Sequence, residues 1–177
     1  MLNFFKIYSM QRNGWFLLFV ATVILISISL YFQHGMNLEP CVMCIYERTA
    51  LFGIMFASLI GLLYPKSTFL RLLGLIIALG CAIKGFEVAL THLDLQLNPA
   101  PWKQCPLVPE FPTTLPLDKW IPFIFKPSAP CGLEQWQFLG LSMVQWILII
   151  FVVYILLLAL LLMSQFKRSK PQRRLFR

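Results

Sequence analysis

The sequence predicts an all-α membrane protein, a bundle of four transmembrane helices with a long outer loop between the third and fourth helices. Three observations predict it: the apolar composition, four long stretches almost free of charge, and basic residues gathered at one set of their ends. Hydrophobic residues make up 59% of the 177-residue chain and charged residues 12%, whereas soluble domains average about 45–50% and about 25%. Because one soluble core cannot bury this apolar surplus, we expect it to face lipid and residues 1–177 to form a single membrane domain.

The first predicted span covers residues 14–32 and lies in an uncharged run between Arg12 and His34. Because Lys6 and Arg12 precede it, the run could instead be a cleaved signal peptide. It is longer than the usual apolar core of a signal peptide, and Leu30–Gln33 has no small residue for a cleavage site. We therefore interpret the run as a retained helix.

Three further spans are predicted at residues 45–64, 71–91 and 145–163. Each supplies roughly the 20 residues that a hydrocarbon layer about 30 Å thick requires. The apolar runs are continuous, whereas the strands of a membrane barrel would alternate between apolar and polar residues. Continuous runs therefore favour helices, whose backbone hydrogen bonds are satisfied within the segment.

Basic residues distinguish the two sides of the predicted bundle. One side carries cations and no acid: Lys6 and Arg12 precede the first span, Lys66 and Arg71 lie in the second connection, and six cations follow the fourth span. The loop at residues 93–142 instead mixes cations with acids. The positive-inside rule therefore places both termini in the cytoplasm and the loop outside. Because this placement accounts for the net charge of +8, we expect no nucleic acid partner.

Cys41 and Cys44 form a C-x-x-C at the outer start of the second span, directly after Pro40. Proline is common at helix starts, and the N–H groups and dipole of a helix N-terminus stabilise a thiolate. Arg48 follows Cys44 by four residues, so it lies on the same helical face, one turn deeper. A cation so near the apolar layer is costly and usually functional. The pattern predicts a redox-active pair, with Arg48 placed to favour a thiolate and to polarise the carbonyl of an electron acceptor.

A second pair, Cys105 and Cys131, lies in the predicted outer loop. It could form a structural disulfide, which stabilises a loop of this length by roughly 3 kcal/mol in the entropy model. It could also join Cys41 and Cys44 in a zinc site, although only one of the two pairs has the close spacing that zinc sites favour. In a redox interpretation the loop pair reaches a soluble protein, and the pair at the bilayer reaches a lipid-soluble oxidant. Cys81, inside the third span, is expected to be a small core residue.

Several strings of the sequence resemble the DsbB family of disulfide bond formation proteins of the bacterial inner membrane. They are residues 32–34 (FQH), 39–48 (EPCVMCIYER), 115–120 (LPLDKW) and 135–140 (QWQFLG). The resemblance covers nearly the whole chain, and it includes the four spans and the second outer cysteine pair.

The resemblance implies a mechanism. A disulfide between Cys105 and Cys131 would oxidise reduced DsbA, a soluble periplasmic thiol oxidant, through a mixed disulfide at Cys105. Electrons would then pass to Cys41 and Cys44, and Cys44 would donate them to ubiquinone, with menaquinone as the alternative, at a site that includes Arg48. The implied enzyme is a quinone-dependent thiol oxidase of the bacterial inner membrane, with its redox cysteines on the periplasmic side.

Several residues keep two interpretations each. His92, at the outer end of the third span, either lies near the quinone pocket or is a solvated helix-end histidine. Lys84 and Glu87 either pair with each other inside the bundle or move protons to the reduced quinone, and Trp146 is either an interface anchor or a ligand contact. The alternatives to an enzyme are a scaffold whose loop is held by disulfides and a quinone- or haem-binding electron carrier. The only histidines, His34 and His92, are poorly placed to be haem ligands.

Overall fold

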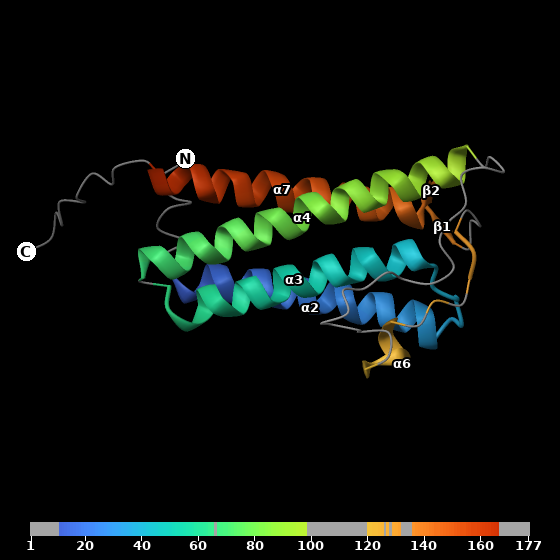
Figure 1. The fold of residues 1–177 in the computed structure, drawn as a ribbon, viewed down its shortest axis with the longest axis horizontal. Helices are drawn as coiled ribbons and strands as arrows, with labels where there is room; N and C mark the ends of the chain where they lie inside the picture. Colours follow the sequence, from blue (N-terminus) through green and yellow to red (C-terminus); the bar gives the residue numbers. More distant parts are fainter. Residues whose placement is uncertain are drawn as a thin grey trace, which may run out of the picture.

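Four long helices form the body of the molecule in the computed structural model, which describes residues 11–65, 67–98, 120–125, 127, 129–131 and 136–166. They are α2 (Arg12–His34), α3 (Val42–Leu63), α4 (Thr68–Leu97) and α7 (Met143–Phe166). Each is long and apolar enough to cross a membrane. Figure 1 shows them running side by side along the molecule. The predicted all-α bundle of four spans is therefore confirmed, while the assignment of its two ends to the two sides of the membrane stays a prediction.

Every helix end except the C-terminal end of α3 lies beyond the predicted span, because the spans mark apolar residues and not the ends of the backbone hydrogen bonding. The largest difference is in α4, which ends at Leu97 and not at residue 91. Residues 93–97, which we assigned to the loop, are therefore helical. The backbone N–H of Asn98 closes the helix by donating to the carbonyl oxygen of Asp94 at 2.9 Å. With 30 residues, α4 is about 45 Å long and projects beyond a hydrocarbon layer of about 30 Å.

The described part of the predicted loop contains a short helix and a hairpin. The helix is α6 (Pro122–Phe125), and the strands β1 (Gln137–Phe138) and β2 (Leu141–Ser142) pair antiparallel. Leu139 and Gly140 between the strands have φ values of 54° and 77°, as the commonest two-residue hairpin turn requires. Figure 1 shows all three elements at the end of the bundle where α2 ends and α3 begins. Cys105 and most of the loop lie outside the described residues.

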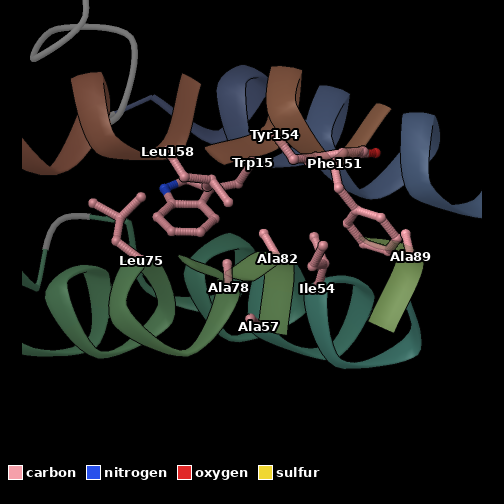
Figure 2. Packing of buried hydrophobic residues seen from close by; sticks show 10 residues of the cluster. All are labelled: Trp15, Ile54, Ala57, Leu75, Ala78, Ala82, Ala89, Phe151, Tyr154 and Leu158. Carbon is pink, nitrogen blue, oxygen red and sulfur yellow. The ribbon is translucent and has the colours of Figure 1, made fainter. Parts of the chain in front are cut away.

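Small residues on α3 and α4 allow neighbouring helices to pack closely against them. The core cluster, drawn in Figure 2, consists of Trp15, Ile54, Ala57, Leu75, Ala78, Ala82, Ala89, Phe151, Tyr154 and Leu158. A Cβ at Gly85 of α4 would overlap the ring of Phe151 on α7, and a Cβ at Gly61 of α3 would overlap the ring of Trp15 on α2. Close backbone approach at small residues is the usual way in which membrane helices associate. Through this packing α3, whose start carries Cys41 and Cys44, lies against both α2 and α4.

The sequence predicted an ion pair and a core cysteine in α4. Lys84 donates a hydrogen bond to Glu87 at 2.7 Å, so the expected pair forms. The two side chains are 76% and 54% exposed, so the pair lies on the outer face of α4, and its placement inside the bundle was wrong. Cys81 is a free thiol packed against the core cluster, as predicted.

Candidate active site

Cys41 and Cys44 lie together at the start of α3. Cys41 is the N-cap, with an extended backbone (φ −83°, ψ 169°), and its Sγ accepts the backbone N–H of Cys44 at 3.4 Å. The two sulfur atoms are 3.1 Å apart, and both residues are free thiols. A disulfide bond is about 2.0 Å long. The pair is therefore a dithiol that a small approach of the sulfurs and the loss of two electrons and two protons would convert into a disulfide.

The surroundings of Cys41 favour its thiolate. The pKa of this thiol falls from 9.0 to about 4, chiefly because of the hydrogen bond with the side chain of Cys44. Burial acts in the opposite direction, whereas a hydrogen bond with His92, the charge of His92 and the backbone N–H of Cys44 lower the pKa further. At neutral pH Cys41 is therefore a thiolate, the form that attacks disulfides and electrophiles.

A buried pair of ionisable residues, His92 and Glu47, adjoins Cys41. The Nε2 atom of His92 lies 3.6 Å from the sulfur of Cys41, and its Nδ1 atom lies 3.0 Å from Oε1 of Glu47. Both residues are only 3% exposed. The second carboxylate oxygen of Glu47, Oε2, is buried without a hydrogen-bond partner among the described residues. Because isolated buried polar atoms are costly, this oxygen indicates a place for a ligand or a proton.

Arg48 is buried between α3, α2 and α6. Its Nε donates to the hydroxyl of Ser29 at 3.0 Å, and its Nη1 donates to the side chain of Gln33 and to the carbonyl of Ile124, each at 2.7 Å. The fourth hydrogen bond, from Nη2 to the carbonyl of Ser29, is 3.5 Å long. All these acceptors are uncharged. The guanidinium is therefore held rigidly while its charge stays available to an electron-rich group beside it.

A cavity of about 330 Å³ with a mostly apolar wall lies beside Cys44. Its polar end consists of Ser29, Cys44, Glu47 and Arg48. Apolar side chains of α2, α3 and α7 and the aromatic residues Trp136, Phe138 and Trp146 form the rest of its wall. The rings of Trp136 and Phe138 are stacked, with centroids 5.7 Å apart, and Trp146 donates its indole N–H to the carbonyl of Phe138 at 3.1 Å. An apolar pocket with a few polar groups at one end is typical of cofactor and small-molecule sites.

A second, smaller cavity of about 40 Å³ separates Cys41 from Cys131. Its wall includes His92, Gln96 and both cysteines of the C-x-x-C. Cys131 is disulfide-bonded, so its sulfur is not a thiolate and does not serve in the four-cysteine zinc site considered above. The sulfurs of Cys41 and Cys44 and a nitrogen of His92 do lie within 4.8 Å of one another. These three donors are one fewer than a structural zinc site uses.

The structure brings together most of the residues predicted from the sequence, but it divides them between two cavities. Arg48 and Cys44 line the larger cavity. His92 is neither solvated nor part of that wall; it lines the smaller cavity beside Cys41. Sequence reasoning missed Glu47, although an acidic residue in an otherwise apolar span is a signal of function. Trp146, considered mainly as an interface anchor, lines the larger cavity.

The sequence also matches proteins of known family. The sequence model of the family described as "Disulfide bond formation protein DsbB" matches residues 11–161. A protein named Disulfide bond formation protein B from Pasteurella multocida is 63% identical over 177 residues, covering 99% of each chain. Proteins of the same name from Mannheimia succiniciproducens and Haemophilus influenzae are 58% and 49% identical, covering 98% and 99% of each chain.

Proposed function

Because this chain belongs to the DsbB family of disulfide bond formation proteins, we propose that it reoxidises a periplasmic thiol oxidant of the DsbA type and passes the electrons to a membrane quinone. Family membership establishes a redox role in disulfide bond formation for this multi-pass membrane protein. The proposal adds the electron donor, the electron acceptor and the bacterial inner membrane as the location, with the cysteines on the periplasmic side. It makes the chain a quinone-dependent protein-dithiol oxidoreductase.

The observation that carries the proposal is the position of Cys44 and Arg48 at the polar end of an apolar cavity. A quinone is a flat ring with two carbonyl oxygens, and it accepts two electrons and two protons. The aromatic wall suits the ring, and the guanidinium of Arg48 suits a carbonyl oxygen on which negative charge develops. Cys44 then lies where a sulfur can donate electrons to the bound ring. Ubiquinone and menaquinone share these features, and we propose ubiquinone as the first to test.

The two sulfurs of the C-x-x-C have separate surroundings, which supports a direction of electron flow. Cys41 lies beside Cys131 at the smaller cavity, whereas Cys44 lines both cavities. In the proposed reaction, the DsbA-type dithiol reduces the disulfide of Cys105 and Cys131, and that pair reduces Cys41 and Cys44 by thiol–disulfide exchange. Each exchange forms one disulfide and breaks one, so the two electrons and two protons of the donor arrive at the C-x-x-C.

The direct test combines the purified protein, a reduced DsbA-type protein and ubiquinone, with quinone absorbance as the measure of reduction. We expect catalytic quinone reduction, and we expect Cys41→Ser and Cys44→Ser each to abolish it. Cys81→Ser is the matched control, because Cys81 packs in the core away from both cavities. A scaffold held by structural disulfides would give no turnover in the unmodified protein, and this result would refute the proposed function.

A further inference from the structure

We propose that His92 and Glu47 form a proton path that carries the proton of Cys41 to an oxygen of the quinone in the larger cavity. This path presupposes the quinone reduction proposed above and assigns a step of that reaction to two residues. Both are buried, and they connect the sulfur of Cys41, which does not line the larger cavity, with the wall of that cavity.

The path is a continuous series of contacts. It begins at the sulfur of Cys41, 3.6 Å from Nε2 of His92. The opposite ring nitrogen, Nδ1, lies 3.0 Å from Oε1 of Glu47. Glu47 lines the larger cavity, and its Oε2 is the atom without a hydrogen-bond partner in the described part of the chain. An imidazole can take up a proton at one nitrogen and release one from the other, so it connects the sulfur with the carboxylate.

The proton balance of the reaction requires such a carrier. Oxidation of the dithiol by a quinone breaks two S–H bonds, forms one S–S bond and makes two O–H bonds, while two electrons pass from the sulfurs to the ring. Cys44 lines the larger cavity and can release its own proton there. Cys41 does not line that cavity. While Cys41 is a thiolate, its proton can reside on the His92–Glu47 pair, from which Oε2 of Glu47 delivers it to the quinone oxygen.

Three other ionisable groups, Arg48 in the cavity wall and Lys84 and Glu87 on α4, do not offer the same route. Arg48 lines the cavity, but a guanidinium does not give up its proton in a protein. Lys84 and Glu87 bond to each other on the outer face of α4, away from both cavities. Among the described residues that line the larger cavity, Glu47 is the carboxylate. It is therefore the group that can both hold a proton and face the quinone.

The first experiment replaces Glu47 by glutamine, which keeps the size and the hydrogen-bonding capacity of the side chain but cannot carry a proton. In Glu47→Gln we expect quinone affinity to stay within about twofold and the rate of quinol formation to fall about 100-fold, a typical effect of removing a proton-transfer group. Glu47→Asp keeps the carboxyl group and should recover part of the lost rate. Glu87→Gln, an exposed carboxylate on α4, is the matched control and should keep the full rate.

A second measurement needs no bound quinone. Infrared difference spectra between the dithiol and disulfide states of quinone-free protein should contain a carboxyl band, because the proton associated with Cys41 moves onto or off Glu47. The band should disappear in Glu47→Gln and persist in Glu87→Gln. A residue that only supports the fold would not produce this band.

The outcomes separate this path from the proposed function. If the unmodified protein reduces quinone and Glu47→Gln does so at the same rate, the path is refuted while the proposed function stands. If the unmodified protein reduces no quinone, both are refuted. If Glu47→Gln loses quinone binding, His92→Gln provides the test, because His92 does not line the larger cavity. An unchanged rate in His92→Gln refutes the path, and a large loss at unchanged quinone affinity supports it.

Discussion

The pKa of Cys41 predicts an alkylation rate that is almost independent of pH. With a pKa of about 4 in the folded protein, against 9.0 for an ordinary thiol, Cys41 is about 90% thiolate at pH 5 and almost fully so at pH 7. An ordinary thiol is only about 0.01% thiolate at pH 5 and about 1% at pH 7. The folded-state pKa lies below the reference value, so the thiolate is the stable form above about pH 4 and is lost only as the pH falls through that value.

The absolute rate at neutral pH is a poor test of this prediction. A thiolate of lower pKa is also a weaker nucleophile, and a Brønsted coefficient of about 0.4–0.5 over five pKa units lowers its intrinsic reactivity roughly 100- to 300-fold. At pH 7 this loss roughly cancels the gain of about 100-fold in thiolate fraction. Cys41 is also only 5% exposed, which slows alkylation at every pH and leaves the pH dependence of the rate unchanged, so the pH profile is the test.

The assay is timed alkylation of the reduced protein with iodoacetamide from pH 5 to pH 8, with Cys41 quantified by peptide mass spectrometry. The rate should change less than about twofold over this range, whereas the unfolded chain should gain about tenfold per pH unit. Cys44→Ala removes the largest cause of the low pKa and should move the profile toward higher pH. A tenfold rise per pH unit in the unmodified, folded protein would refute the assignment of a thiolate to Cys41.

Two further predictions concern Arg48 and the packing of α4. Arg48→Lys keeps the charge but cannot reproduce the forked hydrogen bonds to Gln33 and its neighbours, so we expect quinone affinity to fall about 10- to 100-fold in a binding titration; unchanged affinity would contradict the role of the guanidinium. Gly85→Ala places a Cβ against the ring of Phe151 and should lower the free energy of unfolding by about 1–3 kcal/mol, measured by thermal denaturation in detergent. Gly80→Ala is its control, because a Cβ there meets nothing within 4 Å, and equal destabilisation of the two variants would contradict the packing argument.

Local signals in the sequence were sufficient to predict the four spans and the grouping of Cys41, Cys44 and Arg48 at the start of one helix. Proline followed by C-x-x-C marks a helix start within a few residues, and the structure has Cys41 as the N-cap of α3. The position of Arg48 one turn after Cys44 follows from helical periodicity alone. The end of α4 was harder to predict from the sequence, because the apolar run ends earlier while the helix continues to Leu97.

The remaining part of the site depends on contacts between distant segments. Glu47 is 45 positions from His92 along the chain, and no local pattern joins an acid in one span to a histidine in another. Arg48 is bound by the backbone carbonyl of Ile124, and every residue has such a carbonyl, so the sequence does not identify this partner. The aromatic wall likewise forms only when the hairpin brings Trp136 and Phe138 against α7.

The two cysteines of the C-x-x-C lie in chemically different surroundings. Cys41 is outside the helix as its N-cap, beside His92 and the smaller cavity, whereas Cys44 is inside the first turn and beside the larger one. Glu47 follows Cys44 by about one helical turn and contacts His92 on α4. Arg48 donates hydrogen bonds to Gln33 on α2 and to Ile124 on α6. In the proposed reaction, electrons therefore enter at one sulfur and leave at the other. Glu47, which accepts a proton, and Arg48, which stabilises developing negative charge, line the larger cavity with Cys44, the sulfur from which the electrons leave.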